Sequence, residues 1–170
     1  RQTLRAGINY FIQSHICVLL LITGFIWVSG TAGSMDMRQI MEHARAHSAT
    51  ISPWPFIILF TGFAFKAGFV PLHTWLPWAH PAAPAHVSGV MSGVIIKMGI
   101  FGIFRVLPLC QGNVLAMGRL ILILSTATAL YGVMVAIVQH NLKRLLAYHS
   151  IENIGIIGMG LGLGLMGTGM

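Results

Sequence analysis

Long apolar runs separated by polar connections dominate the pattern of hydrophobic and polar positions along this chain. A helix needs roughly 20 predominantly apolar residues to cross a bilayer. Five runs approach this length, and they cover residues 10–29, 54–70, 87–107, 114–138 and 145–166. The pattern therefore predicts an all-α, polytopic transmembrane helical bundle of about five spans. With five crossings, the two ends of the chain lie on opposite sides of the membrane.

The connections between these runs differ in length and polarity. Residues 30–53 include Asp36, Arg38 and Glu42, which indicates a water-exposed loop with one short surface helix. The other connections are brief. Two pairs of glycines, Gly158 with Gly162 and Gly160 with Gly164, form small-x-x-x-small faces in the last span, and such faces let another helix approach closely.

The second run contains its own interruption. The stretch "FKAGFVPLHTWLPWAHPAAPAHVSG", residues 65–89, places Gly68 and Pro71 directly after Lys66. Proline lacks the backbone donor that the next helical turn requires. We therefore expect a broken helix between Lys66 and Pro71, with free carbonyls beside the ammonium group. Further prolines follow, so we expect residues 72–85 to form an ordered, non-helical cap.

Composition supports insertion into a membrane. Hydrophobic residues make up 56% of the chain and charged residues only 8%, with a mean hydropathy of +0.82. These values lie outside the range of soluble domains of this size. Because the chain begins at Arg1 and stops at Met170 within a glycine-rich apolar run, we interpret residues 1–170 as an internal fragment of one transmembrane domain.

The net charge of +7 indicates orientation in the membrane and contact with anionic lipid. Four basic residues share one predicted side with no acidic residue among them: Arg1, Arg5, Lys143 and Arg144. By the positive-inside rule this side is cytoplasmic. Nucleic-acid binding is excluded as a function class, since it requires a solvated basic face.

Lys66 and Lys97 are the most informative residues. A lysine near the centre of a span costs about 2.5 to 3.5 kcal/mol of insertion free energy, so such residues usually have a function. The alternative is that they extend to the membrane surface. Lys97 follows Gly89 and Gly93 on one helical face, where a helix or a file of water can approach. An ammonium group loses solvation in a low-dielectric interior, which favours its neutral form. We therefore expect Lys66 and Lys97 each to exchange a proton.

A third polar group lies in "HNLKRLLAYHSIENIG", residues 140–155. Lys143 is either a positive anchor at a helix start or part of a proton path. Glu152 stands inside the apolar run, one turn from Tyr148 and three residues from His149, and it needs a partner. Lys97, or a group outside these 170 residues, could balance its charge.

Other candidate sites have weaker support. Cys17 and Cys110 lack C-x-x-C partners, so we expect small buried residues and neither a disulfide nor a zinc site. His73, His80 and His86 are separated by prolines, a spacing that gives no metal-ligand geometry. We consider His73 either a member of the proton path or a polar residue lining the loop. His15 is expected to be a satisfied interior histidine.

Two of these stretches, "FKAGFVPLHTWLPWAHPAAPAHVSGVMSGVIIKMGIFGIFR" and "HNLKRLLAYHSIENIG", carry a family resemblance. They resemble the antiporter-like proton-translocating subunits of respiratory complex I, multisubunit sodium/proton antiporters and energy-converting hydrogenases. "PWAHPAAPAHVSG" and "YHSIENIG" are most similar to the large membrane subunit of the hydrogenase-4 and formate hydrogenlyase group. Complex I subunits more often carry an acidic residue where Trp78 or Ala79 stands, and a serine where His149 stands.

The resemblance implies a role for each lysine. Lys66 corresponds to the lysine of the broken helix, Lys97 to that of the following span, and Lys143 to one at the cytoplasmic start of a later helix. It also implies that Lys66 pairs with a glutamate from an earlier span. His73, His149 and Glu152 complete the candidate proton relay.

The implied function is proton translocation by a non-redox membrane subunit of an oxidoreductase complex of the formate hydrogenlyase type. The alternatives are the corresponding subunit of NADH-quinone oxidoreductase or of a sodium/proton antiporter. The resemblance places iron-sulfur clusters and nickel-iron, or flavin and quinone, in partner subunits and no cofactor in this chain. It also implies a bacterial or archaeal cytoplasmic membrane, with protons or sodium as the transported ion.

Two other function classes stay open on the sequence alone. A membrane cytochrome would need histidines facing each other across spans to ligate haem, and His15 and His149 are the candidates. A structural membrane anchor would tolerate neutral residues at Lys66 and Lys97. Replacing these lysines by alanine separates an anchor from a proton relay.

Overall fold

The computed structural model describes residues 2–47 and 52–168, and all regular structure within these ranges is helical. The helices are α1 (Gln2–Ala32), α2 (Met37–Ala46), α3 (Trp54–Ala67), α4 (Leu76–Ala82), α5 (Ala85–Val90), the π-helix η1 (Met91–Ile95), α6 (Ile96–Val106), the 3₁₀ helix η2 (Leu107–Asn113), α7 (Val114–Ile137) and α8 (Leu142–Thr168). Within the described ranges, four helical segments are long and apolar enough to span a membrane, and α3 is a shorter apolar helix.

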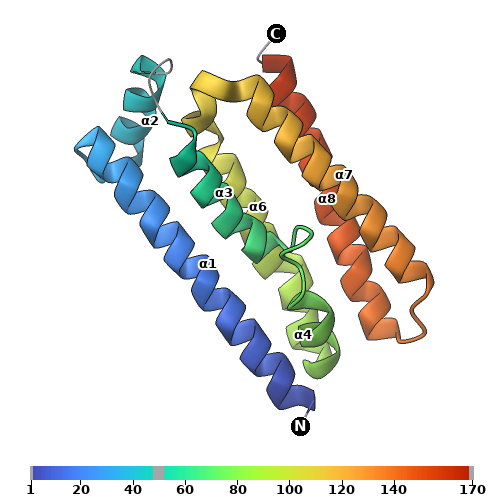
Figure 1. Ribbon diagram of the computed structural model, residues 1–170. Coiled ribbons are helices and arrows are strands. Elements are labelled where there is room, and N and C mark those ends of the chain that lie inside the picture. The colour runs from blue at the N-terminus through green and yellow to red at the C-terminus, as the bar shows by residue number, and fades with distance from the viewer. Residues whose placement is uncertain (1, 48–51, 169–170) are drawn as a thin grey trace.

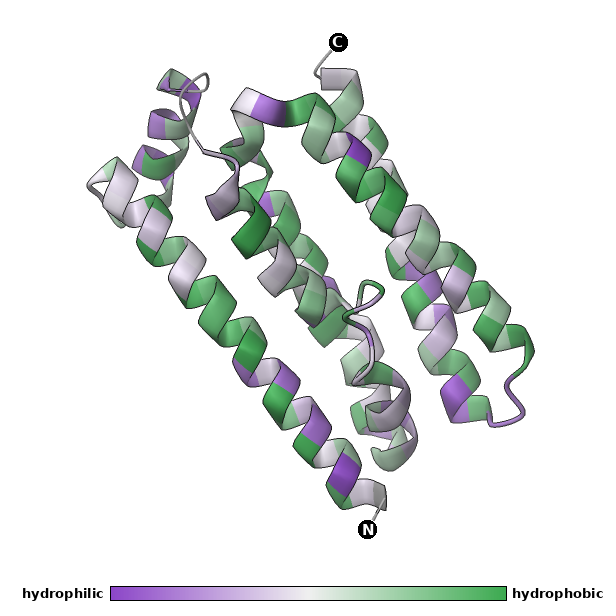
Figure 2. Ribbon diagram, in the orientation of Figure 1, coloured by the Kyte–Doolittle hydropathy of each residue, from purple (hydrophilic) through white to green (hydrophobic). Residues whose placement is uncertain are grey.

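The long helices lie side by side, and the chain passes five times between the two ends of the bundle (Figure 1). The start of α1, the short helix α4 and the α7–α8 connection share one end, while α2 lies at the other. The second pass is made by α3, the break after it and α4. Four of the five predicted spans are therefore continuous, and the second is interrupted after α3. Hydrophilic residues gather on α2 and near the starts of α1 and α8 (Figure 2).

The predicted break is confirmed at the end of α3. Gly68 adopts the left-handed conformation with φ of 83°, which glycine reaches without a steric penalty. The Gly68 and Phe69 N–H groups both donate to the Ala64 carbonyl, at 2.9 and 3.1 Å. The Val70 N–H donates to the Thr128 hydroxyl of α7 at 3.1 Å. The break is thus fixed to another helix through its backbone.

Two expectations for the region after the break are wrong. Residues 76–82 form the helix α4, because Pro77 lies in its first turn, where no intrahelical donor is needed, and Pro81 lies near its end. Free carbonyls were also expected beside Lys66. The Phe65 carbonyl is not free, since the Trp75 indole N–H donates to it at 2.9 Å. The region is ordered by these contacts and by the burial of Trp75 and Leu76.

Glycines set the close packing of α7 on α8. A methyl group at Gly155 would lie 2.4 Å from the Ala129 backbone nitrogen, and one at Gly162 would lie 2.8 Å from that of Leu122. Gly158 faces the Ser125 side chain and the Phe69 ring. The face formed by Gly158 and Gly162 is therefore a helix-packing face, as predicted. Gly160 and Gly164 meet nothing within 4 Å among the described residues, so their predicted packing is not made there.

The predicted surface helix in the polar connection is α2. The Asp36 carboxylate caps it by accepting the Arg38 N–H at 3.0 Å. Ile40 and Ala44 form its buried face, and α2 packs against η2. Residues 48–51, which belong to the same predicted loop, lie outside the described residues.

Candidate functional site

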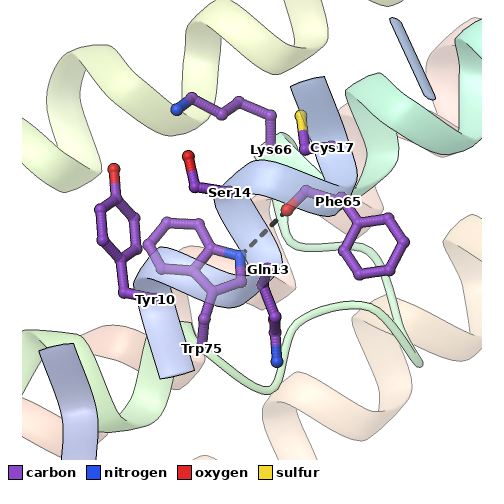
Figure 3. A pocket seen from close by; sticks show the side chains of 7 residues that line it. All are labelled: Tyr10, Gln13, Ser14, Cys17, Phe65, Lys66 and Trp75. Carbon is purple, nitrogen blue, oxygen red and sulfur yellow. Dashed lines mark hydrogen bonds between the residues drawn. The ribbon is translucent and has the colours of Figure 1, made fainter. Parts of the chain in front are cut away.

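Lys66 lines a small cavity between α1 and the end of α3. The other lining residues are Tyr10, Gln13, Ser14, Cys17, Phe65 and Trp75. In Figure 3 the Lys66 ammonium and the hydroxyls of Tyr10 and Ser14 end on the same side of this cavity. The volume of about 10 Å³ is close to the room that one water molecule occupies. The geometry therefore places the ammonium beside polar groups that a single water could bridge.

The position of Lys66 follows from the end of its helix. It lies in the last turn of α3, where the partial negative charge of the carbonyl end favours a cation. Among the described residues, no carboxylate lies within ion-pair distance of Lys66, and its ammonium forms no hydrogen bond. A half-buried positive charge in an apolar span is usually balanced by a negative group. The described residues do not supply such a group for Lys66.

Lys97 lies near the start of α6, just after the π-helix η1. Its side chain is exposed among the described residues, contrary to the expected burial, and lines a larger, open cavity of about 540 Å³ between the third span and α8. Gly89 and Gly93 line the same cavity, as their shared helical face predicted, and a methyl group at either would meet nothing within 4 Å. π-helical turns occur often at functional sites, and this one ends two residues before Lys97.

The two lysines lie near the crossing of α3 and α6 but line different cavities. Gly99 marks this crossing, because a methyl group there would lie 2.6 Å from the Ala67 backbone nitrogen and 2.9 Å from the Phe63 carbonyl oxygen. Lys66 precedes Ala67 by one residue, and Lys97 precedes Gly99 by two. The structure thus brings the two helices together beside the lysines, while the two side chains line different cavities.

Three polar residues that sequence analysis missed share the Lys97 cavity: Ser92, Ser150 and Asn153. The Ser92 and Ser150 hydroxyls form a hydrogen bond of 2.7 Å across it. A signal for Ser92 was present, since it stands three residues after Gly89 and so shares its helical face. No comparable signal connects residue 92 with residues 150 and 153, because this contact depends on how the third span packs beside α8.

Lys143 holds the start of α8 in place. Its backbone N–H donates to the Asn141 side chain at 3.0 Å, and its ammonium donates to the Ala83 carbonyl at 2.9 Å. The Arg144 guanidinium lies 5.4 Å from the ring centre of Trp78, a cation–π contact. Both basic residues therefore connect α8 with the segment around α4, and this contact supports the anchoring interpretation of Lys143.

Glu152 pairs with His149, as their spacing allows. The carboxylate lies 2.7 Å from His149 Nδ1, and the two side chains are 23% and 50% exposed. Lys97 forms no ion pair with Glu152 among the described residues, so that expected partnership is not observed. The Tyr148 ring, one turn before Glu152, lies 6.3 Å from the Tyr131 ring of α7.

His73 lies after the break and is buried. Its ring meets Tyr131 edge-on, with 4.8 Å between ring centres, and its Nδ1 has no hydrogen-bond partner among the described residues. His80 is buried in α4, and its Nδ1 bonds the Ser88 hydroxyl. Both histidines belong to the interrupted second pass of the chain, His73 in the break and His80 in α4.

His15 differs from expectation, because its side chain is exposed on α1 and donates to the Phe11 carbonyl of the same helix at 2.8 Å. Its helix α1 lies on the opposite side of the bundle from α8, which carries His149 (Figure 1), so the two helices do not present a pair of facing haem ligands. Cys17 and Cys110 are buried free thiols, as expected.

These features define a multi-pass membrane protein with a broken helix and ionisable side chains inside its spans. The chain belongs to the family described as NADH:quinone oxidoreductase/Mrp antiporter, whose transmembrane model matches residues 1–170.

Among curated relatives, the chain is 38% identical to hydrogenase-4 component B of Escherichia coli K12, over all of the chain and 25% of that protein. It is 36% identical to formate hydrogenlyase subunit 3 of the same strain, over 98% of the chain and 27% of that protein. Among solved structures, the Mrp complex from Dietzia sp. DQ12-45-1b matches with a TM-score of 0.80 and 26% identity, over 94% of this chain and 30% of that one. The chain thus spans about a quarter of the length of these curated relatives.

Proposed function

We propose that this chain is the central part of a proton-translocating subunit in which Lys66 and Lys97 alternately bind a proton. The observation that carries the proposal is the position of Lys66, a half-buried ammonium at a helix break beside a cavity of one-water size, with no carboxylate partner among residues 2–47 and 52–168. A water there can accept a proton from the ammonium and return it, while the hydroxyls of Tyr10 and Ser14 hold the water in place.

The break makes such a site possible at membrane depth. Irregular backbone is tolerated there only where protein or a wet cavity satisfies its polar groups. Here Trp75 satisfies the Phe65 carbonyl and Thr128 satisfies the Val70 N–H. The ammonium of Lys66 is therefore left as the group whose charge can change, while the backbone around it stays fixed.

We further propose that the subunit works in a membrane-bound hydrogenase of the formate hydrogenlyase type. Its similarity to hydrogenase-4 component B and formate hydrogenlyase subunit 3 supports this assignment. The redox cofactors belong to partner subunits in this proposal, and their electron transfer drives the relay by changing the charge near Lys66. The end of the bundle with Arg5, Lys143 and Arg144 faces the cytoplasm.

The test compares Lys66→Ala and Lys97→Ala in the full-length subunit within its complete complex. Acidification of inverted membrane vesicles is measured together with redox turnover. We expect both variants to assemble and to keep redox activity while losing proton translocation. Arg105→Ala is the matched control, since Arg105 is an exposed cation on the same helix α6 as Lys97.

Two results would overturn the relay. Normal acidification by both alanine variants would show that neither ammonium carries protons. Failure of both variants to assemble, with Arg105→Ala assembling normally, would assign the lysines to structure. Loss of translocation in the control as well would indicate a general effect of removing positive charge.

A further inference from the structure

An apolar groove of about 310 Å³ lies between the start of α1 and the segment formed by α5 and η1. Gly7 and Tyr10 line it on α1, and Val87, Met91 and Ile95 line it on the other side. At about 1.5 Å of rise per residue, residues 3–10 extend about 10 Å along α1. This is most of the roughly 15 Å of hydrocarbon in one leaflet of the bilayer. The groove therefore has the length and the polarity of a site for one acyl chain.

A smaller pocket, of about 150 Å³, is continuous with this groove. The groove and the pocket share Thr3, Ala6 and Ala82. Trp78 and Arg144 also line the pocket, with the guanidinium 5.4 Å from the ring centre. Tryptophan is enriched at the depth of lipid headgroups, and a guanidinium offers paired N–H donors that match the oxygens of a phosphate. The pocket thus has the groups that bind a phosphate at the membrane surface.

The positive charge of Arg144 is not balanced by the chain. Among the described residues the guanidinium forms no ion pair. The three acidic residues of the sequence lie elsewhere, since Asp36 and Glu42 belong to the cap and the body of α2, at the other end of the bundle (Figure 1), and Glu152 is bonded to His149. An anionic ligand would complement this end of the bundle.

We propose that the groove and the pocket together bind one anionic phospholipid, with an acyl chain in the groove and the headgroup phosphate at Arg144. The Thr3 hydroxyl can donate to the same phosphate. Lys143 brings a second positive charge close to the headgroup, because its ammonium donates to the carbonyl of Ala83 in the groove wall. A zwitterionic headgroup is disfavoured, since its cationic end would lie near these two basic side chains. The site does not depend on the proposed lysine relay.

The experiment uses the full-length subunit in its assembled complex, reconstituted into phosphatidylcholine vesicles. The probe is phosphatidylglycerol with a photoactivatable diazirine in the middle of one acyl chain, and mass spectrometry identifies the labelled peptides. We expect label on peptides that contain residues 3–10 and 87–95. Unlabelled phosphatidylglycerol should compete with the probe, while added phosphatidylcholine should compete less. Inorganic phosphate should not compete, because it lacks the acyl chain that fills the groove.

Two variants test the two parts of the site. With the probe below saturation, Arg144→Gln should lower labelling of the groove by about tenfold or more, the effect of losing a hydrogen bond between charged groups. Arg5→Gln is its matched control, because Arg5 is an exposed cation on the same turn of α1 but stands two residues from Thr3, off the face that lines the groove.

The second variant, Gly7→Leu, fills the groove and leaves every charge in place. A methyl group at Gly7 meets nothing within 4 Å among the described residues, so the larger side chain extends into the groove without a clash. Labelling should again decrease. Gly30→Leu is its control, since Gly30 also meets open space but lies near the other end of α1. Because Arg144→Gln also removes the contact with Trp78, Gly7→Leu tests the site independently of that contact.

Several results would overturn the lipid site. Absence of label from both peptides in the parent complex would show that another part of the subunit, or a partner, covers the groove. Parent-like labelling of Arg144→Gln or of Gly7→Leu would remove the headgroup site or the acyl-chain site, respectively. Equal competition by phosphatidylcholine would exclude selection by charge. Losses in Arg5→Gln and Gly30→Leu as large as those in the two test variants would show that the labelling is not specific to the groove.

Discussion

Trp75 donates its indole N–H to the Phe65 carbonyl at 2.9 Å, and this bond closes the helix break beside Lys66. The carbonyl belongs to the last turn of α3, where the Gly68 and Phe69 N–H groups both donate to the Ala64 carbonyl instead. Trp75 also packs against Tyr10 of α1, with 5.2 Å between ring centres. One side chain thus joins the break to the helix that forms the other wall of the Lys66 cavity.

Replacing Trp75 by phenylalanine removes the hydrogen bond and keeps most of the apolar contact. Because the Phe65 carbonyl would lose its partner in a buried position, we expect a loss of about 1 to 3 kcal/mol in the free energy of unfolding. Thermal unfolding of the purified subunit measures this change. Trp54→Phe is the control, since Trp54 is 60% exposed whereas Trp75 is 3% exposed. Equal effects of the two changes would argue against a specific role for the bond.

The contact between α7 and α8 predicts opposite results for two glycines of the same helix. Gly155→Ala places a methyl group 2.4 Å from the Ala129 backbone, which must shift. We expect a destabilisation of about 1 to 3 kcal/mol, typical of overpacking. Gly160→Ala meets open space among the described residues and should be neutral or slightly stabilising. Comparing melting temperatures of both variants tests this, and similar losses would contradict the helix contact.

The path of the chain predicts which exposed residues share a side of the membrane. Arg5 belongs to the start of α1, His140 to the α7–α8 connection and Arg38 to α2. The start of α1 and the α7–α8 connection share one end of the bundle, and α2 lies at the other (Figure 1). Single cysteines introduced at these positions should react with a membrane-impermeant reagent from opposite sides. We expect Arg5→Cys and His140→Cys to label together, from the cytoplasmic side, and Arg38→Cys to label from the other. Labelling of His140→Cys together with Arg38→Cys would contradict the five-pass path.

The amino-acid sequence by itself was sufficient for the spans, the break and the surface helix. Apolar runs of bilayer length determine the spans, because lipid cannot satisfy backbone groups that are not in helices. Gly68 and Pro71 determine the break through local backbone chemistry, since glycine reaches a positive φ and proline lacks a donor. The cost of an ammonium inside a span was also enough to single out Lys66 and Lys97.

Tertiary structure decided which residues meet. Gly158 and Gly162 have the same spacing as Gly160 and Gly164, yet only the first pair packs on α7 within the described residues. Trp75 reaches Phe65, Ser92 reaches Ser150, and Glu152 bonds His149 and not Lys97. Local propensity cannot specify such choices, because most of these contacts depend on how helices distant in sequence cross one another. Helix crossing is fixed by the packing of whole faces, and so the cavity around each lysine becomes visible only in the folded bundle.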